Sequence, residues 1–219
     1  MNELHSPLLA SVGVGHAFGT RDAAPPPGIR RPRQIHEAAV VRVTNAGAEL
    51  LGEADAVLGS APGVPVGIVT ADCVPVLLST RAGDVVAAVH GGWRGLAAGV
   101  VEAGVAALRR ESPGSEILAA IGPRVGPCCY EVDAPVLDAL EHRDPAALAA
   151  ATTPSRSGHA WLDLGAVSEA ALRRSGVEQV ELLAEVCTAC DTDRFYSVRA
   201  EGPETGRLLH WVRPDPSSS

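Results

Sequence analysis

Two apolar, strand-like runs of the sequence each carry one residue that could ligate a metal. Cys73 lies in TADCVPVLL, and His90 ends the run DVVAAVH seventeen residues further on. If these runs form neighbouring strands, the thiol and the imidazole can reach the same point and form part of a metal site. Residue types alone support this weakly, because a lone cysteine in an apolar strand is usually a small buried hydrophobe.

A third ligand is expected from His36, which lies in RQIHEAAVV where a loop enters a predicted strand. One cysteine and two histidines make three protein ligands, and three leave a position open for water or substrate, as in catalytic zinc sites. The predicted zinc ligands are therefore His36, Cys73 and His90. Asp72 adjoins Cys73 and should point the other way in an extended segment, so it is expected to orient a ligand or hold the turn.

The residues after His90 could hold an anion beside the metal. Gly91 and Gly92 permit a tight turn, and a helix is expected to begin near Arg94 with its N–H groups facing the site. All 18 cationic residues are arginines. The absence of lysine excludes Schiff-base chemistry, a lysine general base and the Walker-type phosphate loop, so arginines or backbone N–H groups must hold any anion.

The other cysteines are interpreted as structural. Five cysteines are an odd number, which favours free thiols or metal ligands over a disulfide framework. Cys187 and Cys190 form a CxxC motif, which could be half of a zinc knuckle or a redox pair, but no second CxxC accompanies it. Cys128 and Cys129 are adjacent and should not easily share one tetrahedral ion, so buried thiols are expected there.

The elements that must position these residues are predicted from apolar patterning. Strands are expected at 35–43, 55–58, 65–70, 74–79, 84–90, 116–121 and 180–186, and helices at 94–110, 134–142, 145–151 and 165–175. Several strands follow one another without a helix, which favours an α+β fold with mixed β-sheets. One domain is expected over 1–219, with its core at about 14–212, a proline-rich loop at 22–33, turns at 111–116 and 152–158, and a disordered tail at 213–219.

The composition of the chain predicts the make-up of its core and speaks against membrane and nucleic-acid-binding proteins. Hydrophobic residues make up 46% of the chain and aromatics only 3%, so the core must consist mainly of Ala, Val and Leu. No apolar run has the roughly 18 residues of a membrane span, and the N-terminus lacks the basic residues of a signal peptide, which predicts a cytoplasmic protein. The net charge of −8 speaks against nucleic-acid binding. A monomer or weak homo-oligomer is expected.

Six blocks, in this order, closely resemble the YfiH family, whose members are also labelled peptidoglycan editing factors or polyphenol oxidases. They are HAFGTR, RQIHEAAV, TADCVPVLL, AVHGGWRGLAAGVV, AAIGPRVGPCCYEV and CTACDTDRFYSVRAEGPETGR. The resemblance covers about residues 14 to 212 and implies a single α+β domain with mixed sheets between helical layers. It also implies zinc bound by His36, Cys73 and His90. Gly91 stands where the family often has alanine, which should only loosen the turn.

The resemblance implies a zinc-dependent purine nucleoside phosphorylase that acts on adenosine, inosine and methylthioadenosine, with adenosine deaminase activity. Catalytic roles are then expected for the three metal ligands and Asp72. Arg21, in HAFGTR, and Arg94 are the candidates for binding phosphate. Asp72 and Glu37 are the candidates for the general acid or base. The partners would be purine nucleosides and phosphate, without nucleic acid or membrane.

Other functions remain open. The family labels also imply a copper-dependent polyphenol oxidase, or an amide hydrolase that edits L-Ser-containing cell-wall precursors. A site of several coppers needs many histidines, whereas the chain has seven, and four of them look like dispersed surface or packing residues: His5, His142, His159 and His210. About one zinc and little copper are therefore expected. Cys73 could instead be the nucleophile of a metal-free hydrolase, or the zinc could merely stabilise a binding module.

Overall fold

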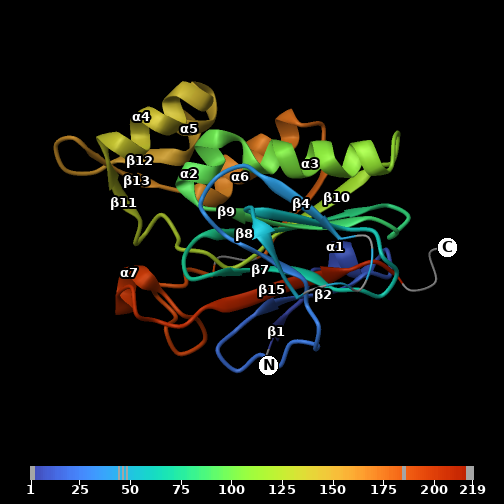
Figure 1. Cartoon of the computed structure of the whole chain (residues 1–219). Coiled ribbons are helices and arrows are strands. Elements are labelled where there is room, and N and C mark those ends of the chain that lie inside the picture. The colour runs from blue at the N-terminus through green and yellow to red at the C-terminus, as the bar shows by residue number, and fades with distance from the viewer. Residues whose placement is uncertain (1–2, 44, 46, 48, 184–185, 216–219) are drawn as a thin grey trace.

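The fold is built on a central six-stranded sheet (Figure 1). The structure is a computed structural model that describes residues 3–43, 45, 47, 49–183 and 186–215. In spatial order the strands are β14 (Gln179–Leu182), β10 (Ile117–Ile121), β8 (Val74–Thr80), β9 (Val86–Gly91), β6 (Ala56–Gly59) and β4 (Val40–Val43). The outermost pair at each edge is parallel, and the inner pairs are antiparallel.

A four-stranded antiparallel sheet covers one face of the central sheet (Figure 1). It consists of β1 (Glu3–Leu4), β2 (Gly15–Gly19), β15 (Leu208–Arg213) and β7 (Val66–Thr70). The remaining strands form two smaller sheets. One contains β11 (Glu131–Asp133), β13 (His159–Leu162) and β12 (Thr152–Pro154), and the other pairs β3 (Arg31–Arg33) with β5 (Leu50–Glu53).

Five helices gather on the opposite face of the central sheet (Figure 1). They are α2 (Trp93–Ala98), α3 (Val100–Glu111), α4 (Ala134–Arg143), α5 (Pro145–Ala151) and α6 (Leu164–Arg174). Two single-turn helices lie elsewhere: α1 (Pro7–Ala10) contacts both β2 and β10, and α7 (Val198–Glu201) precedes β15. None of the helices in the described part of the chain is long and apolar enough to cross a membrane.

Both faces of the central sheet are buried, which explains why its strands read as continuous apolar runs. Along β8, Val76 and Leu78 pack toward the helices, whereas Leu77 between them packs toward the second sheet. The same alternation follows β9 and β10, because successive side chains of a strand point to opposite faces. The hairpin of β8 and β9 is therefore packed on both faces. This makes the end of the hairpin opposite its turn, where Val74 pairs with Gly91, a rigid support for a site.

The prediction of one α+β domain with mixed sheets is confirmed, and most predicted elements occur within two residues of their expected bounds. The strand predicted at 35–43 is wrong over its first half, since only Val40–Val43 form β4. The helix predicted at 94–110 is two helices, because Gly99 adopts a left-handed conformation with φ of +89°. The strand predicted at 180–186 ends at Leu182, and residues 184–185 lie outside the described residues.

Several strands were not predicted, among them β1, β2, β3, β5, β11, β13 and β15. Segments expected to be loops also contribute strands: β3 ends the loop at 22–33, and β12 begins the turn at 152–158. The tail expected to be disordered begins inside β15, and the backbone N–H of Asp215 donates to the carbonyl of Gly83. Residues 216–219 of that tail lie outside the described residues. The proposed core bounds of 14–212 stay a prediction.

Candidate functional site

The hairpin of β8 and β9 brings Cys73 and His90 together. Val74 pairs with Gly91, and Pro75 with His90, so Cys73 and His90 lie at the same end of the hairpin. His36 reaches this end from the segment before β4, where its backbone has a φ of +63°. The potential ligand atoms of the three side chains lie within 4.8 Å of one another. The structure therefore brings together the three residues predicted to bind zinc, whereas the binding itself stays a prediction.

Asp55, directly before β6, positions both histidines. Its carboxylate is fully buried and accepts the backbone N–H groups of residues 35, 36 and 37 at 3.1, 3.0 and 2.8 Å. It also lies 2.7 Å from Nδ1 of His90, whose own backbone N–H donates to the Asp55 carbonyl. One carboxylate thus holds the turn that carries His36 and fixes the ring of His90. These backbone bonds are also why residues 35–37 do not join a strand.

The charges of the site favour a cation held between the histidines. Burial would lower the pKa of His90, but hydrogen bonds to Asp55 and Cys73 raise it to about 9. Burial would raise the pKa of Asp55, yet its hydrogen bonds from His90 and the backbone hold it below the usual range. Burial, followed by the neighbouring His90, lowers the pKa of His36, which keeps that imidazole neutral. With a pKa of about 9, His90 carries its proton at neutral pH, so a metal ion that binds at Nε2 would displace that proton, whereas His36 is already neutral.

The donor set fits a zinc ion. Because Nδ1 of His90 faces Asp55, Nε2 is the nitrogen left to bind a metal. Two imidazoles and one thiol are ligands that zinc prefers, and three ligands leave one tetrahedral position open. Gly92 gives these ligands room, since a Cβ there would lie 2.9 Å from Nδ1 of His36 and 3.3 Å from Sγ of Cys73.

Replacing Gly92 with alanine is expected to weaken metal binding while the fold survives. The backbone of Gly92 has φ −73° and ψ 155°, which alanine adopts without strain, so the added methyl group acts mainly by displacing His36 and Cys73. We expect zinc affinity to fall by about 10-fold or more, comparable to the loss of a residue that orients a ligand. Competition with a fluorescent chelator measures this affinity. The matched control is Gly52→Ala, at a glycine of β5 with open space around it and without a positive φ; an equal loss in that variant would contradict the explanation.

A cavity of about 800 Å³ opens onto the three residues. The residues of its wall include Trp93, Tyr130, Thr70 and Asp72. Burial raises the pKa of Tyr130 to about 12, so its hydroxyl keeps its proton at neutral pH. Five arginines also line the wall: Arg31, Arg33, Arg94, Arg199 and Arg207. Arg33 pairs with Glu53, and the other four guanidinium groups, against the one carboxylate of Asp72, make the cavity attractive to anions.

Arg94 lines this cavity, and the helix that carries it differs from the prediction; its role in phosphate binding stays a prediction. Arg94 belongs to α2, which is only six residues long, and its guanidinium lies 4.2 Å from the ring centre of Trp93. Among the described residues no carboxylate pairs with Arg94, so its charge can serve a ligand. An anion here would therefore be held by arginine side chains rather than by the start of a long helix.

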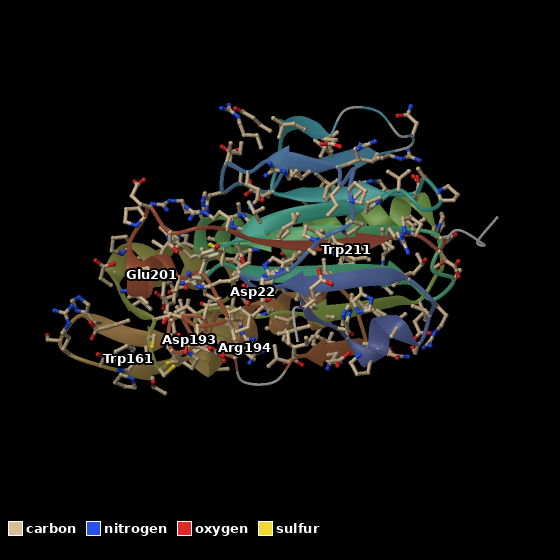
Figure 2. The ribbon with its side chains drawn as sticks, turned by 90° about the horizontal axis from the view of Figure 1, so that it is seen from below. Asp22, Trp161, Asp193, Arg194, Glu201 and Trp211 are labelled. Carbon is tan, nitrogen blue, oxygen red and sulfur yellow. The ribbon has the colours of Figure 1, made fainter. Side chains whose placement is uncertain are left out.

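Three other predicted residues have different surroundings. Arg21 is not among the cavity-lining residues: it pairs with Glu201, donates to the carbonyl of Phe195 at 3.1 Å and stacks on the ring of Tyr196. Figure 2 shows Glu201 at the end of the molecule where α7 lies. Glu37 is exposed and also lies outside the cavity lining. The roles predicted for Arg21 and Glu37 stay predictions.

Asp72 lines the cavity with both carboxylate oxygens already engaged. One accepts the hydroxyl of Thr188 at 2.6 Å, and the other accepts the backbone N–H of Arg199 at 2.7 Å. The backbone of Asp72 has a φ of +92° next to Cys73. These contacts agree with the expectation that Asp72 holds the turn and leave it poorly placed to exchange protons with a substrate.

Four residues at the site were not predicted from the sequence: Asp55, Tyr130, Arg199 and Arg207. Tyr130 and Arg199 lie within blocks that carry the family resemblance, so those blocks could have pointed to them. Asp55 has only a weak signal, an acidic residue directly before the apolar run AVLG. Its partners are 18 to 35 residues away, and no local pattern identifies them.

Fold and site together describe an α+β protein with a candidate two-histidine, one-cysteine metal centre facing a cationic cavity. Residues 20–214 match the family described as multi-copper polyphenol oxidoreductase laccase, and the chain belongs to this family. A purine nucleoside phosphorylase of Pseudomonas aeruginosa is 39% identical over 185 residues, which cover 84% of this chain and 75% of that protein. Purine nucleoside phosphorylase YfiH of Shigella flexneri is 39% identical over 160 residues, which cover 73% of this chain and 63% of that protein.

The fold has a counterpart among solved structures. The crystal structure of a Neisseria meningitidis protein matches with a TM-score of 0.86 and 31% identity, over 98% of this chain and 100% of that one. A Bacillus licheniformis protein named YfiH matches with a TM-score of 0.84 and 25% identity, over 93% of each chain. The resemblance to the YfiH family is therefore confirmed.

Proposed function

We propose that this protein is a zinc-dependent purine nucleoside phosphorylase that acts on adenosine, inosine and methylthioadenosine. The observation that carries the proposal is the single cavity that joins His36, Cys73 and His90 to a group of arginines and two aromatic rings. Relatives named purine nucleoside phosphorylase support an enzyme of this class.

Each part of the cavity suits one part of the substrates. Arg94 covers one face of the Trp93 ring and Arg199 one face of the Tyr130 ring, so a purine would stack on the opposite face of either ring. Arg94, together with Arg199 and Arg207, offers planar donors that match phosphate oxygens. The protonated hydroxyl of Tyr130 can donate a hydrogen bond to a purine nitrogen. His36, Cys73 and His90 would hold the zinc ion, which when bound supplies Lewis-acid polarisation of a substrate oxygen or a water molecule.

The reaction needs positioning and charge stabilisation. A phosphate oxygen forms a bond to C1′ of the ribose while the bond from C1′ to the purine nitrogen breaks, and the purine leaves with that electron pair and takes up a proton. The products are the free base and ribose 1-phosphate, or 5-methylthioribose 1-phosphate when the substrate is methylthioadenosine. The arginines hold the phosphate and oppose its negative charge as it approaches C1′, and the walls of the cavity exclude water that would compete with it.

Adenosine deamination is the second candidate activity, and the open position of a three-ligand zinc site favours it, since such a position can activate water. A copper-dependent polyphenol oxidase is less well supported. Only two histidines, His36 and His90, meet at a potential metal site among the described residues, which is few for a centre of several coppers. An amide hydrolase of serine-containing cell-wall precursors would use the same cavity. A cytoplasmic location remains part of the proposal.

Chromatography of adenosine incubated with zinc-loaded protein, with and without phosphate, tests the proposal. Adenine that appears only with phosphate is the expected result. Inosine formed in both tubes would establish deamination instead, and unchanged adenosine in both would contradict both nucleoside activities. Metal analysis of the same sample distinguishes zinc from several bound coppers.

Replacing Arg94 with alanine is expected to raise the KM for phosphate about 10-fold or more while the KM for adenosine changes little. The reason is that a charged hydrogen bond to phosphate contributes about 1.5–3 kcal/mol. Initial rates at varied phosphate concentration measure the effect. Arg110→Ala, at an exposed arginine near the end of α3, is the matched control. An equal change in both variants would show that Arg94 has no specific role.

A further inference from the structure

Four of the five cysteines meet at a second place, outside the cavity. Cys128 and Cys129 follow β10 in a loop, and Cys187 and Cys190 precede α7. Their sulfur atoms all lie within 4.8 Å of one another, and none of the four residues lines the cavity. Seen from below, sulfur atoms gather at the end of the molecule that carries Trp161 and Asp193 (Figure 2). The interpretation of Cys128 and Cys129 as buried thiols is wrong, since the first is exposed and the second half-buried.

The distances between the sulfur atoms suit one tetrahedral ion. Sγ of Cys190 lies 3.6 Å from Sγ of Cys128 and 3.3 Å from Sγ of Cys129. A zinc ion with bonds of about 2.3 Å to four sulfurs separates them by about 3.8 Å, so only small movements would complete the shell. A disulfide bond is about 2.05 Å long and would account for only two of the sulfurs.

Two tight turns aim the four sulfurs at the same point. In the first, the backbone N–H of Cys129 donates to the carbonyl of Gly126 at 3.0 Å. In the second, the N–H groups of Cys190 and Asp191 both donate to the carbonyl of Cys187 at 3.1 Å. The N–H of Gly126 also donates to Sγ of Cys187 at 3.1 Å, which links the turns and favours a thiolate. Adjacent cysteines can share a site here because the turn directs both sulfurs toward Cys190.

We propose that Cys128, Cys129, Cys187 and Cys190 bind one structural zinc ion, in addition to the ion proposed at His36, Cys73 and His90. Four thiolates fill a tetrahedral shell and leave no position for substrate, so this zinc stabilises the fold and takes no part in chemistry. The expectation of about one zinc per chain therefore becomes two.

This second ion would brace the wall of the cavity. Thr188 lies between the two cysteines of the CxxC motif, and its hydroxyl donates to Asp72, directly before Cys73. The backbone N–H of Thr188 donates to the carbonyl of Arg124, and that of Val125 to the carbonyl of Asp72. The loop of Cys128 and Cys129 leads to Tyr130, and the chain after Cys190 leads to Arg199, both in the cavity wall. An ion joining the two loops would fix the position of both.

Counting zinc in matched double variants of the full chain tests the proposal. Each protein is purified in the presence of zinc and dialysed against metal-free buffer. Its zinc content per chain is then measured by inductively coupled plasma mass spectrometry. We expect two zinc ions per wild-type chain, one in His36→Ala/His90→Ala and one in Cys187→Ser/Cys190→Ser. The X-ray absorption of zinc in His36→Ala/His90→Ala should show four sulfur neighbours.

Other outcomes would overturn the proposal. A His36→Ala/His90→Ala variant without zinc would show that the four cysteines bind none, even if the cysteine variant fails to fold. Iron in place of zinc would assign a different metal. Alkylation of denatured, chelator-treated protein without a reductant should modify all five cysteines; two or four unmodified cysteines would indicate disulfides. These measurements are independent of nucleoside turnover, so failure of the proposed activity leaves this test unaffected.

Discussion

Replacing Cys73 with alanine is expected to remove the zinc ion proposed at His36 and His90 and to abolish phosphorolysis of adenosine. Two imidazoles would remain of the three-ligand set, and among the described residues no other potential ligand is grouped with both of them. Loss of a residue that only orients a ligand lowers metal affinity or activity about 10–100-fold, so loss of a ligand itself should exceed that range. Zinc content and initial rates on the same sample measure both effects.

Cys73→Asp separates a metal ligand from a nucleophile. A carboxylate can bind zinc in place of a thiolate, so a ligand role predicts that this variant retains part of the zinc and of the activity. A thiol nucleophile predicts no rescue, and it also predicts rapid alkylation of Cys73 by iodoacetamide in zinc-loaded protein. His159→Ala, at a half-buried histidine of β13 that is not among the cavity-lining residues, is the control for loss of an imidazole alone. Full activity in Cys73→Ala would refute both roles.

Asp55→Ala should be the most destabilising of these substitutions, by about 3–5 kcal/mol. The buried carboxylate accepts three backbone N–H groups and contacts His90, and alanine would leave all four without a partner. Removal of one partner from a buried network costs the desolvation of every group left behind. Urea unfolding at fixed pH, with zinc removed by chelation, measures the free energy of unfolding without the contribution of the metal.

Asp55→Asn is the informative companion of Asp55→Ala. Its side-chain oxygen can still accept part of the backbone hydrogen bonds, so we expect a smaller loss of stability, but its uncharged amide no longer favours a cation on His90. Zinc affinity should therefore fall about 10–100-fold even where the variant folds well. Asp193→Ala, at an exposed carboxylate labelled in Figure 2, is the control and should change neither quantity. Equal stability of Asp55→Ala and the control would show that Asp55 does not organise the site.

Much of the fold followed from the sequence because its core elements have local signals. The apolar runs of β8, β9 and β10 indicated strands buried on both faces, and the spacing of apolar residues indicated α4, α5 and α6. Pairing of two neighbouring runs was enough to place Cys73 beside His90. Strands β2 and β15 were missed because their residues, such as Gly15 and Arg213, show no clear alternation. They become strands by pairing with each other and with β7.

The sequence by itself determined the class of fold and the absence of lysine chemistry, and the blocks that resemble the YfiH family predicted His36, Cys73 and His90 as zinc ligands. Each of these depends on residue types or on patterns within a short stretch. Only the tertiary structure decided that Asp55 supports both histidines, that the cavity is lined by Arg199 and Arg207, and that four cysteines meet at one point. The physical reason is that these contacts join segments far apart in the chain. Hydrogen bonds and sulfur clusters of that kind have no periodicity, so they exist only once the chain has folded.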